Sequence, residues 1–325
     1  MRSTHTRAAV LSQARGPVVI ESHHLGEPEA GEVLLRLEAC GLCHSDLFVA
    51  GLDKLPLAPL TLGHEGIGRV EAVGAGVTEW SPGDRAGITF LGTTCGTCEF
   101  CKSGRERFCP KQTNFGYTLQ GALGEYAIAP ARALVRVPER LSATDAAPLC
   151  CAGWTAYGAL REAALSPGQS VAIFGYGGLG HLALQLALHQ GLKPVVADPS
   201  PNKLAAAEYS GASIAPPRGV DAAIVFTAAP AAIPQAFKAL RRNGALILVG
   251  LSATNYELPL VDTVLKGITI RGSYLGTRQD LARVFALAGE GVLRPHVHTH
   301  ALDEAPALLE QMRRGELPGR AVIAF

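Results

Sequence analysis

Hydrophobic and polar residues alternate along the chain in two different ways, and the pattern changes after Pro148. Before that residue, short apolar runs such as residues 8–11, 18–20 and 33–37 are separated by turns rich in Gly and Pro. Runs of this length with frequent turns are typical of β-strands. The first part of the chain is therefore predicted to form a compact, β-rich, barrel-like domain.

The second part of the chain alternates helical patterns with short apolar strands. Helical patterns lie at residues 154–165, 203–210 and 280–288, with a further one that ends at residue 192. Continuous apolar runs, which are typical of buried parallel strands, lie at residues 171–174, 194–197, 221–226, 244–249 and 268–270. This alternation predicts an α/β fold with a doubly wound parallel sheet.

The end of the chain returns to the texture of its beginning. After residue 293, short strand-like runs surround a helical pattern at residues 304–314. We expect this tail to fold back onto the first domain. The predicted boundaries are 1–147 for the first domain, 148–286 for the parallel-sheet domain and 287–325 for the returning tail.

Composition and charge exclude several classes of function. The 325 residues include 29 Lys and Arg against 28 Asp and Glu, so a net charge of +1 gives no field that would attract nucleic acid or an acidic membrane. No apolar run reaches the length of a membrane span, and the first ten residues lack the apolar run of a signal peptide. We therefore expect a cytoplasmic protein, in which eight cysteines indicate metal binding rather than disulfides.

One short stretch concentrates groups that bind metal and move protons. Cys40 and Cys43 are followed at once by His44, Ser45 and Asp46, which brings thiolates, an imidazole, a hydroxyl and a carboxylate into a single turn. This combination suits a zinc ion with a proton acceptor beside it. The alternative is that the two cysteines form a redox pair or are buried apolar thiols.

Two later stretches supply further candidate zinc ligands. His64 and Glu65 follow about twenty residues on, and Cys150 and Cys151 lie much later in the chain. Three protein ligands that are far apart in sequence, with a fourth position left open, are typical of catalytic zinc. The spacing alone does not select one cysteine from each pair.

A third cysteine cluster predicts a second, closed metal site. Four thiolates at this spacing can surround one tetrahedral zinc ion and hold together a segment that has little apolar sequence of its own. An iron–sulfur cluster is the rival, although the last spacing is longer than in the bacterial ferredoxin run. A nucleic-acid-binding zinc ribbon is disfavoured, because few basic residues flank the cluster. Its members are Cys95, Cys98, Cys101 and Cys109.

The parallel-sheet domain begins with a glycine-rich turn between a strand and a helix. The glycines let the backbone approach a pyrophosphate at the N-terminus of the helix. Asp198, at the end of the next strand, is placed to accept hydrogen bonds from the ribose hydroxyls of adenosine. Because no Arg or Ser follows it in a way that would suit a 2′-phosphate, NAD is favoured over NADP. The turn consists of Gly175, Tyr176, Gly177, Gly178, Leu179 and Gly180.

Taken together, these motifs make the chain resemble the zinc-containing medium-chain alcohol dehydrogenase family over essentially its full length. The resemblance rests on the stretch from Cys40 to Asp46, the stretch from Gly63 to Gly66, the four-cysteine cluster, the Cys151-Ala152-Gly153 turn, and the glycine turn with Asp198. It implies a GroES-like β-rich catalytic domain followed by a Rossmann domain. It also implies a homodimer or homotetramer that acts on a small alcohol or aldehyde.

The resemblance also assigns roles around the catalytic zinc. It implies that Cys43, His64 and Cys151 hold the ion, and that Cys40 and Cys150 are buried in packing instead. Glu65 would then lie behind the metal, where it would bind the ion transiently during ligand exchange, and Asp46 would orient the imidazole of His64. Zinc supplies Lewis acidity, Ser45 accepts the proton of the substrate hydroxyl, and hydride passes to the nicotinamide.

The resemblance further implies a set of contacts to the cofactor. His44 and Arg320 would contact its phosphates, Lys203 its ribose, and Thr155 with Leu179 the nicotinamide. For the weaker positions, ordinary packing is the competing interpretation. These weaker positions are Thr227, Val249, Leu251, Ser273 and Leu275.

The chain departs from the family pattern at Phe48. Many relatives carry a histidine there, three residues after the relay serine or threonine, as the outer proton acceptor. The proton that leaves Ser45 would then pass to the cofactor ribose or to water, unless one of His296, His298 and His300 reaches the site. The remaining alternatives are a polyol, amino-alcohol or cinnamyl-type dehydrogenase that uses NADP, and a non-catalytic NAD-binding descendant.

Overall fold

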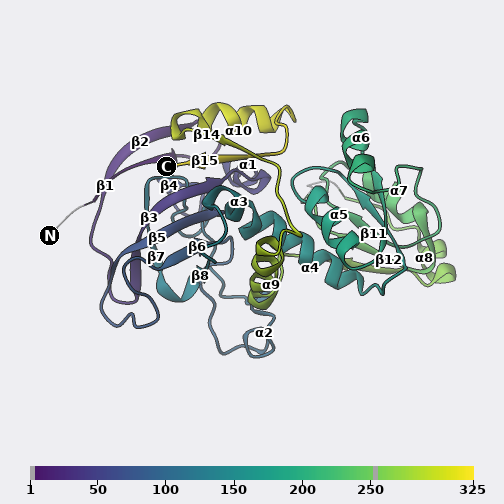
Figure 1. The fold of residues 1–325 in the computed structure, drawn as a ribbon, viewed down its shortest axis with the longest axis horizontal. Helices are drawn as coiled ribbons and strands as arrows, with labels where there is room; N and C mark the ends of the chain where they lie inside the picture. The colour runs from purple at the N-terminus through teal and green to yellow at the C-terminus, as the bar shows by residue number, and fades with distance from the viewer. Residues whose placement is uncertain (1–3, 252–254) are drawn as a thin grey trace. The chain divides into compact units, whose positions relative to one another are not determined.

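A computed structural model describes residues 4–251 and 255–325, and its chain divides into two compact units (Figure 1). The first unit comprises Met1–Cys151 and Pro295–Phe325, and the second comprises Ala152–Arg294. The second unit is therefore inserted between two parts of the first. Each unit has its own sheets and its own core.

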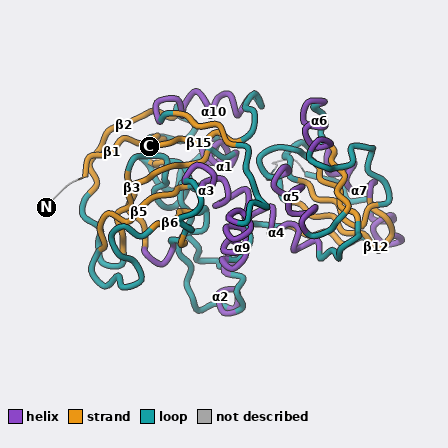
Figure 2. The backbone as a smooth tube through the Cα atoms, viewed as in Figure 1, coloured by secondary structure: helices purple, strands orange, loops and turns teal. Residues whose placement is uncertain are grey.

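The first unit is rich in short strands (Figure 2). Its strands are β1 (Thr4–Leu11), β2 (Val18–Leu25), β3 (Glu32–Gly41), β4 (Leu60–Thr61), β5 (Gly66–Val73), β6 (Arg85–Ile88), β7 (Tyr126–Pro130), β8 (Val135–Arg136), β14 (Val297–His300) and β15 (Arg320–Ala324). Its α-helices are α1 (His44–Ala50), α2 (Glu99–Lys102), α3 (Ala143–Pro148) and α10 (Ala305–Arg313). Single turns of other helix types lie at η1 (Glu106–Phe108), η2 (Ala131–Ala133), η3 (Leu149–Gly153) and η4 (Leu302–Glu304).

Two sheets enclose the core of the first unit. The smaller has the order β2-β1-β4, and the larger has the order β14-β15-β3-β5-β6-β8, with β7 also paired to β3. Side chains such as Leu11 on β1, Leu35 on β3 and Phe115 in a loop are fully buried in the core of this unit. The last strand, β15, pairs antiparallel with β3, so the C-terminal segment completes the sheet that the N-terminal segment begins.

The second unit alternates strands and helices. Its strands are β9 (Ser170–Phe174), β10 (Lys193–Ala197), β11 (Val220–Val225), β12 (Leu240–Leu248) and β13 (Thr269–Gly272), in the parallel order β10-β9-β11-β12-β13. Its helices are α4 (Trp154–Ala163), α5 (Gly180–His189), α6 (Pro201–Tyr209), α7 (Ala232–Ala239), α8 (Leu260–Lys266) and α9 (Arg278–Gly289). The predicted doubly wound sheet is present.

A carboxylate ties the N-terminal ends of two central strands together. Asp221 on β11 accepts hydrogen bonds from the backbone N–H of Ser170 at 2.8 Å and from its hydroxyl at 2.7 Å. The amide of Gln169 donates at 3.0 Å, and Nε of Arg241 donates at 2.8 Å. Burial acts to raise the pKa of Asp221, but these donors outweigh it and hold the pKa well below its usual range.

One strand differs from the prediction. Residues 268–270 were expected to form a buried strand, but β13 is the outermost strand of its sheet and all four of its residues are exposed. Its neighbour α8 also exposes large aliphatic side chains, including Val261 at 71% and Val264 at 68%. An apolar run indicates that its side chains are buried, but it does not show whether they are buried within one chain or against a second one.

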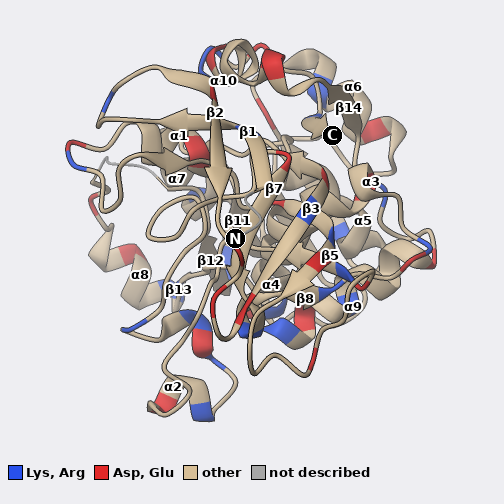
Figure 3. Ribbon diagram, turned by 90° about the vertical axis from the view of Figure 1, so that its left-hand side faces the viewer, with Lys and Arg blue, Asp and Glu red and all other residues tan. Residues whose placement is uncertain are grey.

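Acidic and basic residues are interspersed along the ribbon (Figure 3). This distribution agrees with the near-neutral composition of the chain. Among the described residues, no helix combines the length and the apolar character that crossing a membrane requires.

Candidate active site

The site begins where β3 ends. Gly41 closes that strand, and Cys43 precedes α1, which starts at His44. The side chain of Asp46 folds back over the start of this helix, and its Oδ2 accepts the backbone N–H of Cys43 at 2.9 Å. This bond fixes the backbone that carries the Cys43 thiol.

Asp46 also fixes the imidazole of His64. The Asp46 Oδ1 atom lies 3.2 Å from Nδ1 of His64, and it accepts the backbone N–H of Gly63 at 3.3 Å. Burial lowers the pKa of His64, but the Asp46 carboxylate and the neighbouring Cys43 outweigh it, so the pKa is raised. The two groups lie close together, and the orienting role of Asp46 stays a prediction.

The other ring nitrogen of His64 points into the site without a partner. Its Nε2 atom is buried and makes no hydrogen bond within the described part of the chain. A buried nitrogen left unpaired costs free energy unless another group binds it. The unpaired Nε2 therefore indicates a ligand that the protein chain does not itself supply.

Cys43 and Cys151 complete this side of the site. Their sulfur atoms lie 3.9 Å apart, and Cys151 is carried by the π-helical turn η3. The Cys151 thiol donates to Cys43 and lowers the pKa of Cys43, with a further contribution from His64 and against the effect of burial. The same hydrogen bond raises the pKa of Cys151.

The donor atoms fit a zinc ion. One ligand atom from each of Cys43, His64, Glu65 and Cys151 lies within 4.8 Å of the others, and all four residues are buried. Two thiolates and an imidazole nitrogen are ligands that zinc prefers, and three of them leave a position open for substrate. The set therefore combines a suitable donor chemistry with an unpaired nitrogen.

Glu65 has a second partner within the first unit. Both of its carboxylate oxygens lie 2.5 Å from Nη2 of Arg320, which is carried by β15. Burial raises the pKa of Glu65 to about 8, and the guanidinium of Arg320 acts against this rise. Arg320 was expected to contact a cofactor phosphate, and that contact remains a prediction. The pairing with Glu65 could not be foreseen, because 255 residues separate the two.

The other residues around Cys43, and the two cysteines not assigned to a metal site, occupy different environments. The Ser45 hydroxyl lies 3.7 Å from Sγ of Cys43, beside the candidate metal ligands. Phe48 is 55% exposed on α1, and His44 is also exposed. Cys40 and Cys150 are fully buried, and burial raises the pKa of both thiols, as expected for inert packing residues.

The three histidines considered as replacements for a relay histidine lie on or next to an edge strand. His298 and His300 belong to β14, at the edge of the larger sheet, and His296 lies just before it. Nδ1 of His300 lies 3.2 Å from a carboxylate oxygen of Glu304. Among the described residues, no hydrogen bond links His298 or His300 to Ser45.

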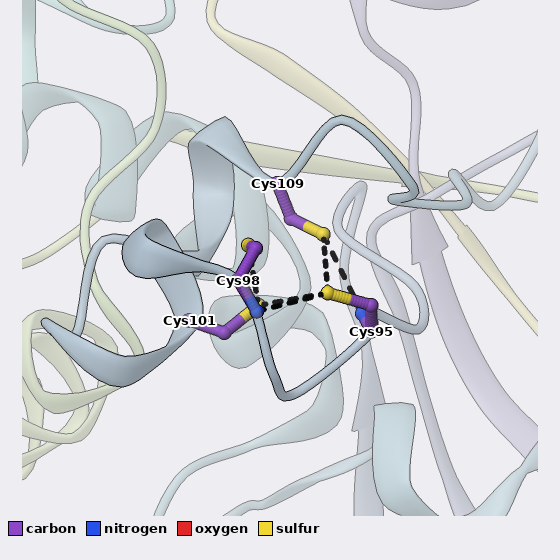
Figure 4. A group of neighbouring side chains, drawn as sticks. All are labelled: Cys95, Cys98, Cys101 and Cys109. Atoms are coloured by element: carbon purple, nitrogen blue, oxygen red, sulfur yellow. Dashed lines mark hydrogen bonds between the residues drawn. The ribbon is translucent and has the colours of Figure 1, made fainter.

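The four-cysteine cluster also comes together (Figure 4). The sulfur of Cys95 lies 3.6 Å from that of Cys109 and 3.9 Å from that of Cys101, and the sulfurs of Cys98 and Cys101 lie 3.5 Å apart. Backbone N–H groups of Thr97 and Cys98 lower the pKa of Cys95 to about 5. Four converging thiols with backbone donors fit a closed, structural zinc site.

The glycine turn of the second unit lies between β9 and α5. Gly175 has a φ of +96°, which favours glycine. A Cβ on Gly180 would lie 2.0 Å from the carbonyl oxygen of Gly175, so glycine is required for this tight packing. Gly177 has no heavy atom within 4 Å of where its Cβ would be, which leaves its backbone open to a ligand. Gly178 and Leu179 follow, and Leu179 caps α5.

Asp198 follows β10 beside this turn. Its Oδ2 accepts the backbone N–H of Tyr176 at 2.8 Å, and its Oδ1 accepts that of Ser200 at 3.0 Å. These bonds hold the carboxylate at the carboxyl end of the sheet, where nucleotides bind in folds of this type.

The other predicted cofactor residues of the second unit vary in position. Thr227, Val249 and Ser273 follow the carboxyl ends of β11, β12 and β13, the same edge as the glycine turn. The Ser273 hydroxyl is buried without a partner among the described residues. Leu275 has an uncommon φ of +53°, and Leu251 is exposed. Lys203 is exposed on α6 and Thr155 is buried on α4, in this unit too.

Two family models match the chain. The model of the alcohol dehydrogenase GroES-like domain matches residues 29–139, and the model of the zinc-binding dehydrogenase matches residues 213–290. The first match contains His64 and all four cysteines of the cluster, and the second lies within the parallel-sheet unit.

Relatives match nearly the whole chain. An alcohol dehydrogenase from Geobacillus stearothermophilus is 40% identical over 336 residues, which cover 98% of this chain and 99% of that protein. The solved alcohol dehydrogenase of the archaeon Aeropyrum pernix is 32% identical with a TM-score of 0.89, and the match covers 98% of this chain and 100% of that one. Acetophenone reductase from Geotrichum candidum NBRC 4597, solved in complex with NAD, is 28% identical with a TM-score of 0.89, covering 100% and 98%.

Proposed function

Since the chain belongs to the zinc-containing alcohol dehydrogenase family, a group of oxidoreductases that interconvert alcohols and carbonyl compounds, we propose which of its residues perform that reaction. The observation that supports the proposal most strongly is the convergence of Cys43, His64 and Cys151, with Nε2 of His64 buried and unpaired. We propose that these three residues hold the catalytic zinc ion and that the cluster of Cys95, Cys98, Cys101 and Cys109 holds a structural one.

The chain's own groups around the zinc have distinct tasks. A zinc ion bound by these ligands would supply Lewis acidity that polarises the oxygen of the substrate. Asp46 holds Nδ1 of His64 and so keeps Nε2 directed into the site. The Ser45 hydroxyl, close to Cys43, is the first group to accept the proton of an alcohol or to return it to a carbonyl compound.

We propose NAD as the preferred cofactor. Asp198 stands at the carboxyl end of β10, where its carboxylate can accept hydrogen bonds from two ribose hydroxyls. A 2′-phosphate would remove one of those hydroxyls and place a like charge beside the carboxylate, which costs several kcal/mol. The glycine turn, the unpaired Ser273 hydroxyl and Lys203 are the supporting contacts.

We also propose that the protein is a homo-oligomer. In the described sheet, β13 pairs with β12 alone, and α8 beside it exposes its aliphatic side chains. A second copy that pairs along this edge would bury both features.

We also propose that the protein is cytoplasmic. Its eight cysteines, all in the described part of the chain, form no disulfide, which suits a reducing compartment.

A single experiment tests the proposed function. The purified protein is assayed with a panel of alcohols and aldehydes, each with NAD and with NADP, and its zinc content is measured. We expect two zinc ions per chain and a clear preference for NAD that Asp198→Gly weakens.

Two results would contradict parts of this proposal. One zinc ion or fewer per fully loaded chain would rule out the pair of sites, and equal efficiency with both cofactors would rule out the role of Asp198. Asp262→Asn, on the exposed surface of α8, serves as the matched loss of a carboxylate and is expected to leave the cofactor preference unchanged.

A further inference from the structure

The backbone conformation at residue 41, the last residue of β3, does not require a glycine. Gly41 does not belong to the glycines with positive φ, in contrast to Gly63 in the same unit, whose φ is +93°. A side chain could therefore be accommodated by the backbone at this position. The reason for a glycine has to be sought in the space around it.

That space is filled by the carboxylate of Glu65. A Cβ on Gly41 would lie 2.0 Å from Oε2 of Glu65 and 3.1 Å from its Cδ atom. Gly41 pairs with Val322 on the neighbouring strand β15, and Arg320 lies two residues before Val322 on the same face of that strand. The Glu65 carboxylate is thus held in a slot between the bare backbone of Gly41 and the guanidinium of Arg320.

The slot lies next to the candidate metal ligands. A carboxylate oxygen of Glu65 is within 4.8 Å of the ligand atoms of Cys43, His64 and Cys151. A carboxylate is itself a zinc ligand, so its position decides whether it competes with substrate for the open site. Glu65 is fully buried, so a displaced carboxylate has no access to solvent.

We infer that Gly41 is a positioning residue, whose lack of a side chain keeps Glu65 paired with Arg320 and away from the open position of the metal site. A methyl group at residue 41 would force the carboxylate to move by about 1 Å or more, because heavy atoms do not approach to 2.0 Å without bonding. The end of the Glu65 side chain is flexible, so the carboxylate can move more easily than the backbone of β3. This inference rests on the zinc site proposed above.

The test uses Gly41→Ala in the full-length protein loaded with cobalt(II). The visible absorption of cobalt(II) is strong with four ligands and weakens when a fifth is added. We expect weaker absorption in Gly41→Ala than in the wild type, together with a decrease of about 10- to 100-fold in kcat/KM for alcohol oxidation. The four-cysteine site is the same in both proteins and cancels in the difference spectrum.

Repeating the substitution in the Glu65→Asp variant separates the positioning role of Gly41 from a general loss of packing. Glu65→Asp keeps a negative charge for Arg320 but is one methylene shorter, which withdraws the carboxylate oxygen that lies 2.0 Å from the added methyl, while Cβ of residue 65 stays at 3.2 Å. In that background, adding Gly41→Ala should change neither the spectrum nor kcat/KM further. Gly87→Ala is the matched control, since its added methyl would meet Val135, Val137 and the Cys150 sulfur as its nearest neighbours.

Three results would contradict the positioning role of Gly41. An unchanged spectrum in Gly41→Ala, the same change in Gly87→Ala, or a change that persists in the Glu65→Asp background would overturn the inference. If Gly41→Ala fails to fold, rescue by Glu65→Asp supports the inference and failure of rescue contradicts it. A protein that binds only one metal ion per chain would overturn the proposed catalytic site as well, whereas two ions with an unchanged spectrum would overturn the inference alone.

Discussion

Phe48 is the residue at which the candidate site departs most clearly from the pattern of its family. It lies on α1, three residues after Ser45, and is 55% exposed. An imidazole there would titrate with an unperturbed pKa of about 6.5, whereas a phenyl ring carries no proton. With Phe48 in place, we predict that the proton from Ser45 leaves by the cofactor ribose or by water.

We predict that Phe48→His increases alcohol oxidation a few-fold just below neutral pH, where part of the added imidazole is neutral and can accept a proton. General-base assistance is typically worth about 10² to 10⁴ in rate, and an outer group that acts through a hydroxyl contributes less. Aldehyde reduction should change less. The measurement is a pH–rate profile on ethanol and on benzyl alcohol.

Phe48→Leu is the control for this prediction, because it changes the size of the side chain without adding a base. Identical pH profiles for the wild type and Phe48→His would dispose of the relay argument. We also expect the wild type to prefer the bulkier alcohol, since an exposed phenyl ring replaces a polar group on α1. A preference for ethanol would rule that out.

At the residue scale, the sequence predicted that a metal site is present, but the spacing did not show which of two neighbouring cysteines belongs to it. Cys40 and Cys43 are equally plausible ligands by spacing. The strand β3 turns Cys40 into the core, and the start of α1 turns Cys43 toward His64. Only the resemblance to a known family selected Cys43 in advance, because the direction of a side chain depends on where a strand ends, and its role as a ligand stays a prediction.

At the scale of elements, the loop that carries the four cysteines has almost no regular structure. Its helices α2 and η1 comprise four and three residues, so it depends on the metal site to hold its shape. Cys98→Ser is therefore predicted to lower the thermal stability of the protein. Cys151→Ser, which removes a proposed ligand of the catalytic zinc, is predicted to abolish activity while the fold is retained.

Thermal unfolding, zinc content and turnover of the two variants are the measurements. Cys40→Ser serves as the control for loss of a thiol outside either metal set, although it also buries a hydroxyl. If Cys151→Ser unfolded the protein and Cys98→Ser only inactivated it, the two roles would have to be exchanged.

The network around Asp221 predicts a dependence of stability on pH. Its pKa in the folded protein lies below the ordinary value, so the stabilisation is complete above a pH of about 4 and is lost as the pH falls toward the folded pKa. Asp221→Asn is predicted to destabilise the protein by about 1–3 kcal/mol at pH 7. The difference from the wild type should shrink in acid.

Urea denaturation at pH 7 and at lower pH checks this prediction. Glu310→Gln is the control, because Glu310 pairs with Arg313 on the exposed surface of α10 and such pairs contribute little. A difference between Asp221→Asn and the wild type that stays constant with pH would show that the charge of Asp221 is not what stabilises the strands.

Among the elements, local pattern predicted the strands and helices but not their exposure. The helix predicted at residues 154–165 is α4, and the strand at 171–174 lies within β9. The last strand of the parallel sheet, β13, has an apolar sequence yet lies at the edge. Sequence periodicity cannot distinguish a core from a face that another chain covers.

At the scale of the whole molecule, the exposed apolar edge predicts self-association. Val261→Glu on α8 is predicted to convert an oligomer into a monomer or to weaken it strongly, because a charge would be buried in the contact. Light scattering at micromolar concentration measures the mass.

Val19→Glu is the control for self-association, since Val19 is also exposed, at 39%, on the edge strand β2 of a different sheet. It should leave the mass unchanged. A monomeric wild type would rule out the oligomer, and an oligomer insensitive to Val261→Glu would place the contact elsewhere.

Long-range partners were the part of the molecule that sequence could not supply. The motifs around Cys43, His64 and Cys151 were visible because each carries chemistry in a short stretch. The pairing of Glu65 with Arg320 spans 255 residues and has no local signature. The space left by Gly41 is equally invisible, since it depends on a carboxylate from another strand.

The pairing of β15 with β3 also has a consequence for how the protein is made. A ribosome releases the N-terminal strands first, yet the sheet that they form is finished by Arg320–Ala324, at the far end of the chain. The inserted unit is complete earlier and can fold on the nascent chain while the first unit waits. Until translation reaches Arg320, the newly made Glu65 has no cation to face, so the catalytic unit matures last although its synthesis began first.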